Sequence, residues 1–515
     1  MPRYKPYSYE QIKLVPLDVN SVLEENTFEH AINYIVDNHL DLTVFDSRFK
    51  NDTTGAPAYD PAIMLKIILY AYSRGITHSR DIADACVENI KFMALSADTS
   101  PHFTTIASFI ASMKDVVIPL FRDVVALCYS LNLIGKEMFA IDGCKISSNC
   151  SKEWSGTRAE FESKKCKIEK SIAYLVGRHR VHDLQQSPSQ VEKKRRKAIK
   201  SMREKINKID AWLKDNPEDK KGARGTIRKS NITDNDSCKM PTAHGVVQGY
   251  TGVAVVDSKN QVIVHAEAFG EGQEAQLLKP VLDGTDETCR ESGVSDEVLR
   301  EAIVIADSGY HSNGNVEMCM KNGVNAYIAD GQFRKRDPRF KDSDKYRKST
   351  DSNKAKYIKK RFYREDFTFN SKRNVLVCPA GKTMVCVNEN YRNDTGLIGP
   401  QYKAQWEDCE HCVFRKKCLQ SNAPRSVTLF NRRDKNVPET YTQKMIRKFD
   451  SPVGRQIYSR RMGIVEPVFA AMKNGAGLDR FTMRGKQKVN AQWILHTIVH
   501  NINKLFRFAP KLLPV

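Results

Sequence analysis

Two apolar, β-branched runs that each end in an aspartate constrain the fold of this chain more than any other feature. One reads MFAIDG and reaches Asp142, and the other reads IVIAD and reaches Asp307. The second run is apolar without a break, which is typical of a strand buried on both faces. Each carboxylate is therefore expected at the tip of a buried strand. Aspartate followed by glycine or serine is also common in turns, so either residue taken alone fits a simple turn former.

The segments around Asp307 predict the rest of a sheet. Strand patterns at 252–257 and 261–269 are separated by a short turn, and NAYIAD at 325–330 reads as another strand. Between them, AQLLKPVLDG looks helical, although Pro280 kinks or shortens it, and NVEMCMKNGV reads as a second helix. This order of elements predicts a mixed α/β sheet.

Two helical regions flank or interrupt these strands. Residues 60–130 read as short helices with polar exposed faces, which fits a helix-turn-helix-like DNA-binding unit and equally a bundle used for packing or dimerisation. From about 151 to 230 the chain is highly charged, and its second half carries an apolar residue every three or four positions. That spacing predicts an inserted antiparallel helical hairpin. The residues that carry it are Ile199, Met202, Ile206, Ile209 and Leu213.

The charge balance indicates a polyanionic partner. The 515 residues include 82 Lys and Arg against 61 Asp and Glu, a formal net charge of +21 with a pI of about 9.3. Such a surface attracts nucleic acid, although a high pI alone fits general stickiness equally well. There is no signal-peptide core and no long uncharged apolar run, and the 13 cysteines are odd in number and scattered. We therefore expect a non-secreted protein in a reducing compartment.

A third acidic residue, Glu466, lies in the helical pattern YSRRMGIVEPVFAAMK. It is eight residues after Tyr458 and seven before Lys473, so the three are expected on one helix face, with Arg461 at the edge. Three carboxylates from two strands and a helix suit a pair of Mg²⁺ ions in phosphodiester chemistry. The neighbouring cations suit phosphate binding. The alternative is an ordinary amphipathic surface helix.

Two further segments carry residues of chemical interest. Cys409, Cys412 and Cys418 have the spacing of thiolate ligands, and Cys378 or Cys386 could complete a structural zinc site; free reduced thiols are the alternative. A basic stretch after Glu466 suits contacts to DNA phosphate, or forms a solvated loop. It comprises Arg480, Arg484, Lys486 and Lys488.

Several motifs in order carry a family resemblance. They are YDPAIMLKIILYAYSRGITHSRDIADAC near the N-terminus, AIDGCKISSNCSKEWSGT, the QGY segment at 248–250, IADSGYH, and the terminal pattern Y-x-x-R…VEPVF…K. From about residue 40 to 508 the chain resembles bacterial insertion-sequence transposases of the DDE class, most like the insertion-sequence 1182 group, which is related to the insertion-sequence 4 type.

The resemblance implies an RNase H-like fold and a set of roles. The catalytic triad falls on Asp142, Asp307 and Glu466, which would hold two Mg²⁺ (or Mn²⁺) ions. The family signature also includes an arginine before the glutamate, which here is Arg461. Four residues separate Arg461 from Glu466, whereas the insertion-sequence 4 signature has three. Met462 therefore lies where that signature has its arginine. A Cys-Pro-x-Gly knuckle in relatives favours Cys378 as the fourth zinc ligand. The accessory phosphate-binding residues are Tyr458, Arg461 and Lys473.

The function that follows is metal-dependent cleavage and strand transfer at the ends of an insertion sequence. The implied partners are double-stranded DNA and further copies of the chain, as a homodimer or larger assembly, in the bacterial cytoplasm at the nucleoid. The alternatives are a transposase-derived, sequence-specific DNA-binding protein without catalytic activity, and a simple metal-dependent nuclease. The expected domains are a helical DNA-binding domain at 1–130, an RNase H-like core at 131–375 interrupted by the hairpin, a Cys-rich insertion at 376–425, and C-terminal helices carrying Glu466 at 426–515.

Overall fold

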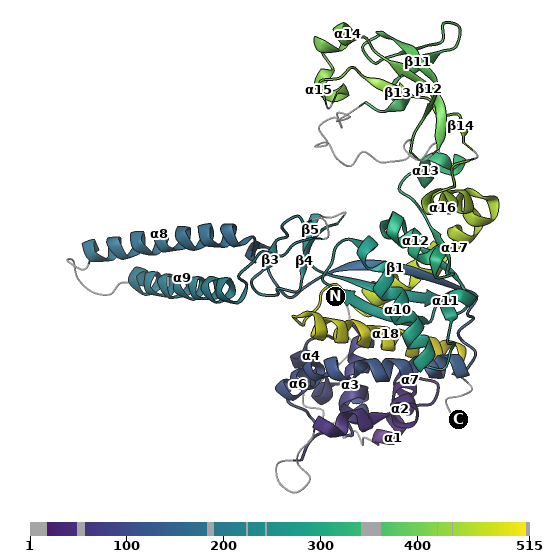
Figure 1. The fold of residues 1–515 in the computed structure, drawn as a ribbon. Helices are drawn as coiled ribbons and strands as arrows, with labels where there is room; N and C mark the ends of the chain where they lie inside the picture. Colours follow the sequence, from purple (N-terminus) through teal and green to yellow (C-terminus); the bar gives the residue numbers. More distant parts are fainter. Residues whose placement is uncertain are drawn as a thin grey trace, which may run out of the picture. The chain divides into compact units, whose positions relative to one another are not determined.

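The chain folds into two compact units. The computed structural model describes residues 18–48, 57–182, 190–222, 225–242, 245–340, 362–394, 396–419, 421–434 and 436–510. The first unit combines Met1–Ala329 with Pro452–Val515, and the second unit is Asp330–Ser451 (Figure 1). The catalytic motifs predicted from the sequence all belong to the first unit.

A mixed six-stranded sheet forms the centre of the first unit. Its order is β4-β5-β1-β7-β8, with β6 also paired to β5. β1 is antiparallel to β5 and parallel to β7, which is in turn parallel to β8. The predicted mixed sheet is thus confirmed, and it is consistent with an RNase H-like domain. The strands are β1 (Met138–Ser147), β4 (Cys238–Thr242), β5 (Gly245–Asp257), β6 (Ile263–Phe269), β7 (Ile303–Ala306) and β8 (Asn325–Ile328).

Helices cover this sheet because its strands are apolar on both faces. α17 (Pro452–Ala470) packs on β1 and β7, and α18 (Lys486–Phe508) and α10 (Leu278–Glu291) pack on β6. Pro280 does not kink α10, because it is the third residue of the helix, where the missing N–H has no partner to lose. Trp493 of α18 lies against Gly252 and donates from its indole Nε1 to the Val253 carbonyl at 3.0 Å. The last helix is therefore packed on the sheet through an apolar and hydrogen-bonded contact.

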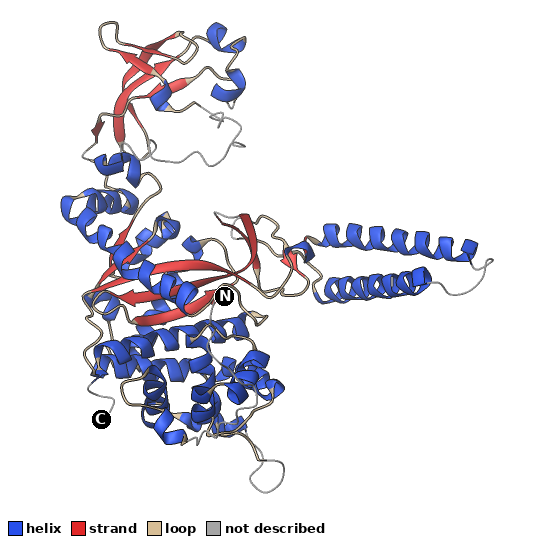
Figure 2. Ribbon diagram, turned by 180° about the vertical axis from the view of Figure 1, so that it is seen from behind, coloured by secondary structure: helices blue, strands red, loops and turns tan. Residues whose placement is uncertain are grey.

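The N-terminal helices gather around α18, which is shared between them and the sheet (Figure 2). The rings of Tyr72 and His496 stack at 4.6 Å in this core. Asp60 accepts a hydrogen bond from the Ala62 N–H at 2.7 Å and so caps the third helix. The helices are α1 (Val19–Val22), α2 (Phe28–His39), α3 (Pro61–Ser73), α4 (Ser79–Glu88), α5 (Ile90–Leu95), α6 (Phe103–Ser112) and α7 (Val117–Ser130).

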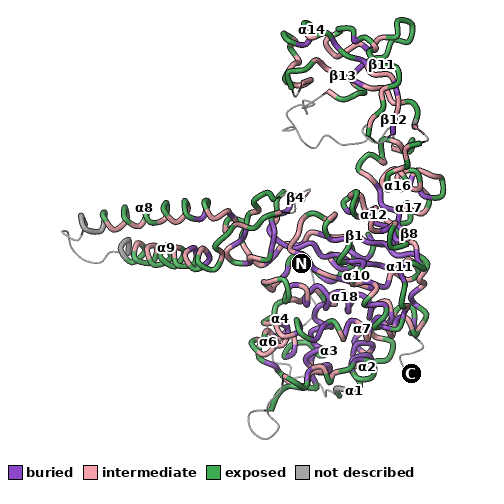
Figure 3. Tube along the Cα trace, in the orientation of Figure 1, coloured by how far each residue is buried: buried purple, intermediate pink, exposed green. Residues whose placement is uncertain are grey.

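Two long helices follow β1, where the hairpin was expected. They are α8 (Arg158–His182) and α9 (Gln190–Asp215), and residues 183–189, which hold the predicted turn, lie outside the described residues. Phe161, Ile209 and Trp212 form a small apolar cluster where the two helices meet the rest of the unit. Elsewhere both helices are exposed over most of their length, as Figure 3 shows. The short pair β2 (Ser155–Gly156) and β3 (Ser230–Asn231) flanks them.

The second unit contains an antiparallel sheet of order β13-β12-β11-β10-β9, with β14 paired to β12. Its small core is built from Leu376, Met384, Tyr402 and their neighbours. The elements are α13 (Phe333–Arg336), β9 (Thr368–Asn370), β10 (Val375–Val377), β11 (Thr383–Arg392), β12 (Leu397–Lys403), α14 (Trp406–Glu410), α15 (Arg415–Cys418), β13 (Ser426–Thr428), β14 (Arg432–Arg433) and α16 (Tyr441–Asp450).

Within the described ranges, no single helix is both long and apolar enough to cross a membrane. The segments Phe103–Asp115 and Val117–Ser130 meet that test only when taken as a pair, and they are bent by 74° at the break between them.

Candidate active site

The register of two parallel strands brings the two aspartates together. Ile141 of β1 lies opposite Ala306 of β7, so the next residues, Asp142 and Asp307, occupy the same level of the sheet. Asp307 directly follows β7, as predicted. The expectation that Asp142 ends its strand is wrong, because β1 continues to Ser147 through its pairing with β5. Asp142 instead lies in the middle of β1, at the level where the neighbouring strand β7 stops.

Helix α17 contributes two side chains to this aspartate pair. The guanidinium of Arg461 pairs with Asp142 Oδ2 at 2.8 Å and with Asp307 Oδ1 at 3.7 Å. The Tyr458 hydroxyl donates a hydrogen bond to Asp307 Oδ1 at 3.2 Å. Tyr458 and Arg461 are three residues apart, so they project from the same side of the helix. Two strands and one helix thus converge on a single polar centre.

Burial and charge act in opposite directions in this centre. Burial raises the pKa of the Asp142 carboxyl above its ordinary value, and the Arg461 guanidinium partly offsets that rise. Burial, followed by the negative charge of Asp307, raises the pKa of Tyr458 to about 12. Tyr458 therefore remains a protonated hydrogen-bond donor at neutral pH.

Glu466 does not join the aspartate pair in this structure. Its side chain is exposed and makes no hydrogen bond or ion pair with any residue the structure describes. Val465, which is fully buried, follows Arg461 by four residues and so lies on the same helix face. Lys473 lies in the π-helical turn Ala471–Gly475 after α17. Its charge acts on Cys144 of β1, whose pKa burial nevertheless raises to about 12.

Another carboxylate that the sequence did not predict lies near this centre, that of Glu274. It begins the short helix η4 (Glu274–Gln276), which connects β6 to α10. Burial raises the pKa of Glu274, and the charges of Asp142 and Asp307 raise it further, while Lys145 lowers it. The surrounding sequence, GEGQEAQ, contains no pattern that distinguishes this glutamate from the other acidic residues of the chain.

The predicted DNA-binding stretch is exposed and partly tied to the protein. Arg480 Nε donates to the Ser148 carbonyl at 3.0 Å, and Arg484 Nε donates to the Asn149 carbonyl at 2.6 Å. Lys486 pairs with a glutamate of β6 at 3.0 Å. Both arginines use only Nε in these bonds, which leaves their terminal nitrogens for other acceptors.

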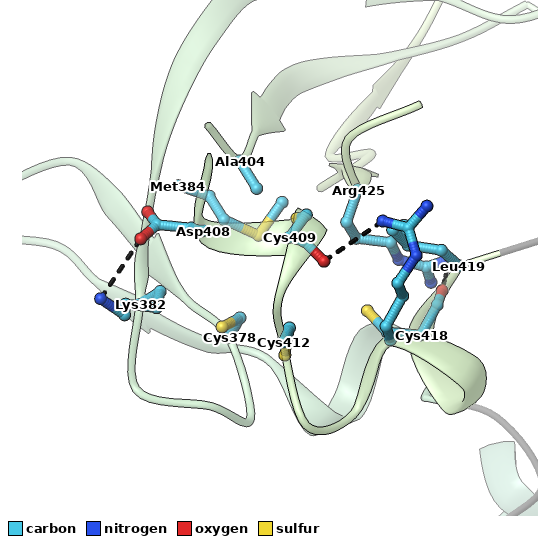
Figure 4. Close-up of a pocket in the computed structure, with 11 residues that line it drawn as sticks. Cys378, Lys382, Met384, Ala404, Asp408, Cys409, Cys412, Cys418, Leu419 and Arg425 are labelled. Atoms are coloured by element: carbon cyan, nitrogen blue, oxygen red, sulfur yellow. Dashed lines mark hydrogen bonds and ion pairs between the residues drawn. The ribbon is translucent and has the colours of Figure 1, made fainter. Parts of the chain in front are cut away.

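Four cysteines line one small pocket in the second unit (Figure 4). Cys378 follows β10, Cys409 lies in α14, Cys412 follows α14 and Cys418 ends α15. The backbone turns tightly at Cys378, where Gly381 adopts a φ of 78° and its N–H donates to the Cys378 carbonyl at 2.8 Å. Cys386 belongs to β11 and is not part of the pocket lining.

Neither the aspartate pair nor the cysteine pocket has its side chains arranged as a complete metal site. Among the described residues, no group of three or more His, Cys, Asp or Glu side chains is arranged to hold a metal ion. In the first unit, the aspartate pair instead forms ion pairs with Arg461. The donor types nevertheless fit the expected ions, because carboxylate oxygens suit Mg²⁺ or Mn²⁺ and thiolates suit Zn²⁺.

A mixed α/β sheet carrying adjacent aspartates, with a helix that brings an arginine and a tyrosine to them, is consistent with a DDE-type domain. Two family models match the chain: a transposase domain (DUF772) over residues 17–112 and a transposase DDE domain over residues 377–506. No curated protein matches it. Both matches support a DDE-type insertion-sequence transposase. The family implies DNA as the substrate.

Proposed function

We propose that this transposase cleaves DNA at the ends of an insertion sequence and joins those ends to target DNA in metal-dependent reactions. The observation that carries the proposal is the placement of Asp142 and Asp307 side by side, with Arg461 and Tyr458 of α17 bonded to them. The chain's net charge of +21 supports a polyanionic substrate. Membership of the insertion-sequence 1182 group remains a prediction from the N-terminal and C-terminal motifs.

Each residue of the centre has a defined part in this proposal. Asp142 and Asp307 would hold the divalent ions, and Glu466 would complete the second ion's ligands. When bound, such ions lower the pKa of the attacking water or 3′-hydroxyl and stabilise the leaving oxygen. Tyr458 positions Asp307 through its hydrogen bond, and Arg461 and Lys473 hold phosphate oxygens of the DNA. No covalent intermediate with the protein is required.

The cysteine pocket is proposed as a structural zinc site with Cys378, Cys409, Cys412 and Cys418 as ligands. Support comes from the four thiols that line one pocket and from the tight Cys-Pro-Ala-Gly turn at Cys378. Four protein ligands leave no open position, so the ion would be structural rather than catalytic. Because Cys386 lies outside the pocket lining, Cys378 is the better fourth ligand.

Metal analysis of the purified protein tests the zinc site. The expected result is about one Zn²⁺ per chain, lost in Cys409→Ser and Cys378→Ser, since a tetrahedral thiolate site needs all four ligands. Cys386→Ser is the matched control and should keep its zinc. Wild-type protein without zinc would refute the site, and loss of zinc in Cys386→Ser alone would refute the choice of Cys378.

DNA contacts are proposed for Arg480, Arg484, Lys486 and Lys488. All four are exposed, and they cluster between the end of α17 and the first turn of α18. Two element ends must be handled together, so the active form is proposed to be a homodimer or a larger assembly on DNA. A transposase-derived binding protein without catalysis is the alternative. Retention of both adjacent aspartates does not favour it, because binding alone does not require them.

A cleavage assay decides between the two functions. Purified protein is incubated with labelled DNA from the flanks of its own gene, with Mg²⁺ or with chelator. Asp142→Asn, Asp307→Asn and Glu466→Gln are expected to abolish cutting and to retain end binding. Asp283→Asn, which removes an exposed carboxylate of α10, is the matched control and should cut normally. Tight binding to the ends without metal-dependent cutting by the wild type would establish the alternative.

A further inference from the structure

Hydrogen bonds connect the segment that carries Glu274 to the segment that follows Asp307. Asn315, in helix α12 (Asn313–Lys321), donates from its side-chain amide to the Ala275 carbonyl and to the Tyr310 carbonyl, both at 2.7 Å. One side chain therefore bridges η4 and η5 (Ser308–Tyr310). The position of the Glu274 backbone relative to Asp307 is consequently fixed by hydrogen bonds.

Because Gly309 has no side chain, the Glu274 carboxylate can approach the aspartate pair. A Cβ atom built on Gly309 would lie 1.8 Å from Glu274 Oε2. The φ of Gly309 is not in the left-handed region, so the glycine is needed here for space rather than for backbone conformation. The carboxylate thus packs directly on the backbone two residues after Asp307.

An unsatisfied buried hydroxyl lies among the same carboxylates. Tyr310 is fully buried, and its hydroxyl has no hydrogen-bond partner in the part of the chain that the structure describes. A Cβ atom on Gly143, the residue after Asp142, would lie 3.3 Å from this hydroxyl. Burial raises the pKa of Tyr310 well above its ordinary value, and the charge of Glu274 is the next largest cause. A buried donor that bonds to none of the acids around it requires an explanation, and a water or ligand oxygen that can accept its hydrogen bond supplies one.

The ion pairs of the centre leave negative charge uncompensated. Arg461 is shared by Asp142 and Asp307, whereas the Glu274 carboxylate forms no ion pair or hydrogen bond with any described residue. Lys145, the other cation whose charge lowers the pKa of Glu274, donates to the Pro241 carbonyl at 3.2 Å. Three carboxylates therefore share one paired guanidinium, an excess that suits a divalent cation.

We propose that Glu274 is a third protein ligand, with Asp142 and Asp307, of a divalent cation of the Mg²⁺ or Mn²⁺ type. The inference rests on the proposed function, because it assigns a further ligand to the same centre. It also requires that Arg461 leave the aspartate oxygens when the cation binds. The Tyr310 hydroxyl would then donate to a water or ligand oxygen held by the ion.

Binding of Mn²⁺ to the full-length protein without DNA tests this assignment, read out by electron paramagnetic resonance of the free ion. Glu274→Gln is expected to weaken Mn²⁺ binding by about tenfold or more, as loss of a metal-centre contact commonly does. Asp307→Asn should weaken it at least as much. Glu291→Gln, at the exposed end of α10, is the matched control and should bind like the wild type.

A second variant tests the same inference in case the Glu274→Gln protein does not fold. Gly309→Ala pushes the Glu274 carboxylate away while leaving every acid in place, and the displaced atoms are the end of a flexible side chain. It is expected to weaken Mn²⁺ binding severalfold and to keep the wild-type circular dichroism spectrum.

The outcomes separate this inference from the proposed function. Wild-type Mn²⁺ affinity in both Glu274→Gln and Gly309→Ala, with loss in Asp307→Asn, overturns the role of Glu274 and leaves the proposed function standing. Absence of Mn²⁺ binding by the wild type, together with cleavage that persists in Asp307→Asn, overturns both.

Discussion

Replacing Arg461 with methionine tests the charge balance of the active centre directly. The substitution removes the guanidinium that pairs with Asp142 at 2.8 Å and with Asp307 at 3.7 Å, and it keeps an unbranched side chain of similar length. The Arg461 and Asp142 side chains are only 13% and 21% exposed, so water replaces little of the lost interaction. The two neighbouring carboxylates then repel each other without compensation.

The expected loss of stability is moderate because burial of Arg461 has its own cost. Opposite charges about 4 Å apart interact by about 4 kcal/mol at an effective dielectric constant near 20. Desolvation of the guanidinium cancels part of this, and Asp307 is 36% exposed. We expect Arg461→Met to lower the free energy of unfolding by about 2 kcal/mol at pH 8.

The pH dependence distinguishes charge from packing. Burial already raises the folded-state pKa of Asp142, and loss of Arg461 raises that pKa further. A carboxyl whose folded-state pKa exceeds its unfolded-state value of about 3.9 loses stability as the pH rises through that interval. The deficit of the variant is therefore largest above the raised pKa and is smaller at pH 4.5 than at pH 8.

Urea unfolding followed by tryptophan fluorescence measures this difference, since Trp493 reports on the sheet and α18. Arg460→Met is the matched control: Arg460 is exposed, and no described residue pairs with it. The control is expected to be within about 0.5 kcal/mol of the wild type at both pH values. An equal deficit for Arg461→Met at pH 8 and at pH 4.5 would refute the electrostatic reasoning.

Three other substitutions probe the framework and the DNA surface. Asp234→Ala should lower the free energy of unfolding, measured with urea, by about 3 kcal/mol or more. The Asp234 carboxylate is 3% exposed and accepts hydrogen bonds from a tyrosine, a serine and the N-terminus of α18. A loss below about 1 kcal/mol contradicts this prediction. Gly249→Ala should cost about 3 kcal/mol or more, since its Cβ would lie 1.9 Å from the Ile146 carbonyl oxygen. The control Gly314→Ala, in open helical space, should be neutral or stabilising in the same assay. Lys488→Ala should weaken DNA binding and should reduce the slope of log K against log salt concentration by about one. Fluorescence anisotropy at several salt concentrations measures this slope. An unchanged slope would show that Lys488 does not contact DNA phosphate.

The sequence predicts those parts of the fold that depend on local apolar pattern. The buried strands before Asp142 and Asp307, the β-hairpin at 252–269 and the final apolar helix are recognisable because hydrophobic periodicity specifies them. The end of a strand is not specified in this way, since β1 continues wherever β5 offers a partner. Asp142 therefore lies inside a strand, although its sequence context resembles a strand end.

Contacts between distant segments explain why Glu274 escaped prediction. Its role depends on the absence of a side chain at Gly309 and on the bridge made by Asn315, which belong to other elements. By contrast, helical spacing predicted Tyr458, Glu466 and Lys473 on one helix face with Arg461 at its edge. In the structure the aspartates instead meet the side of α17 that carries Tyr458 and Arg461.

The spacing within α17 links Arg461 and Glu466 in a final prediction. Each helical residue is turned by about 100° from the one before, so Val465 lies beneath Arg461 and Glu466 points about 100° away from Val465. Any rotation of α17 that brings Glu466 to the aspartates carries Arg461 away from them. Removal of the competing guanidinium should therefore raise the Mn²⁺ affinity in Arg461→Met, while Glu466→Gln should lower it. Electron paramagnetic resonance of free Mn²⁺ measures both variants in the absence of DNA. If Arg461→Met binds Mn²⁺ more weakly than the wild type, the guanidinium supports the metal centre rather than competing with it.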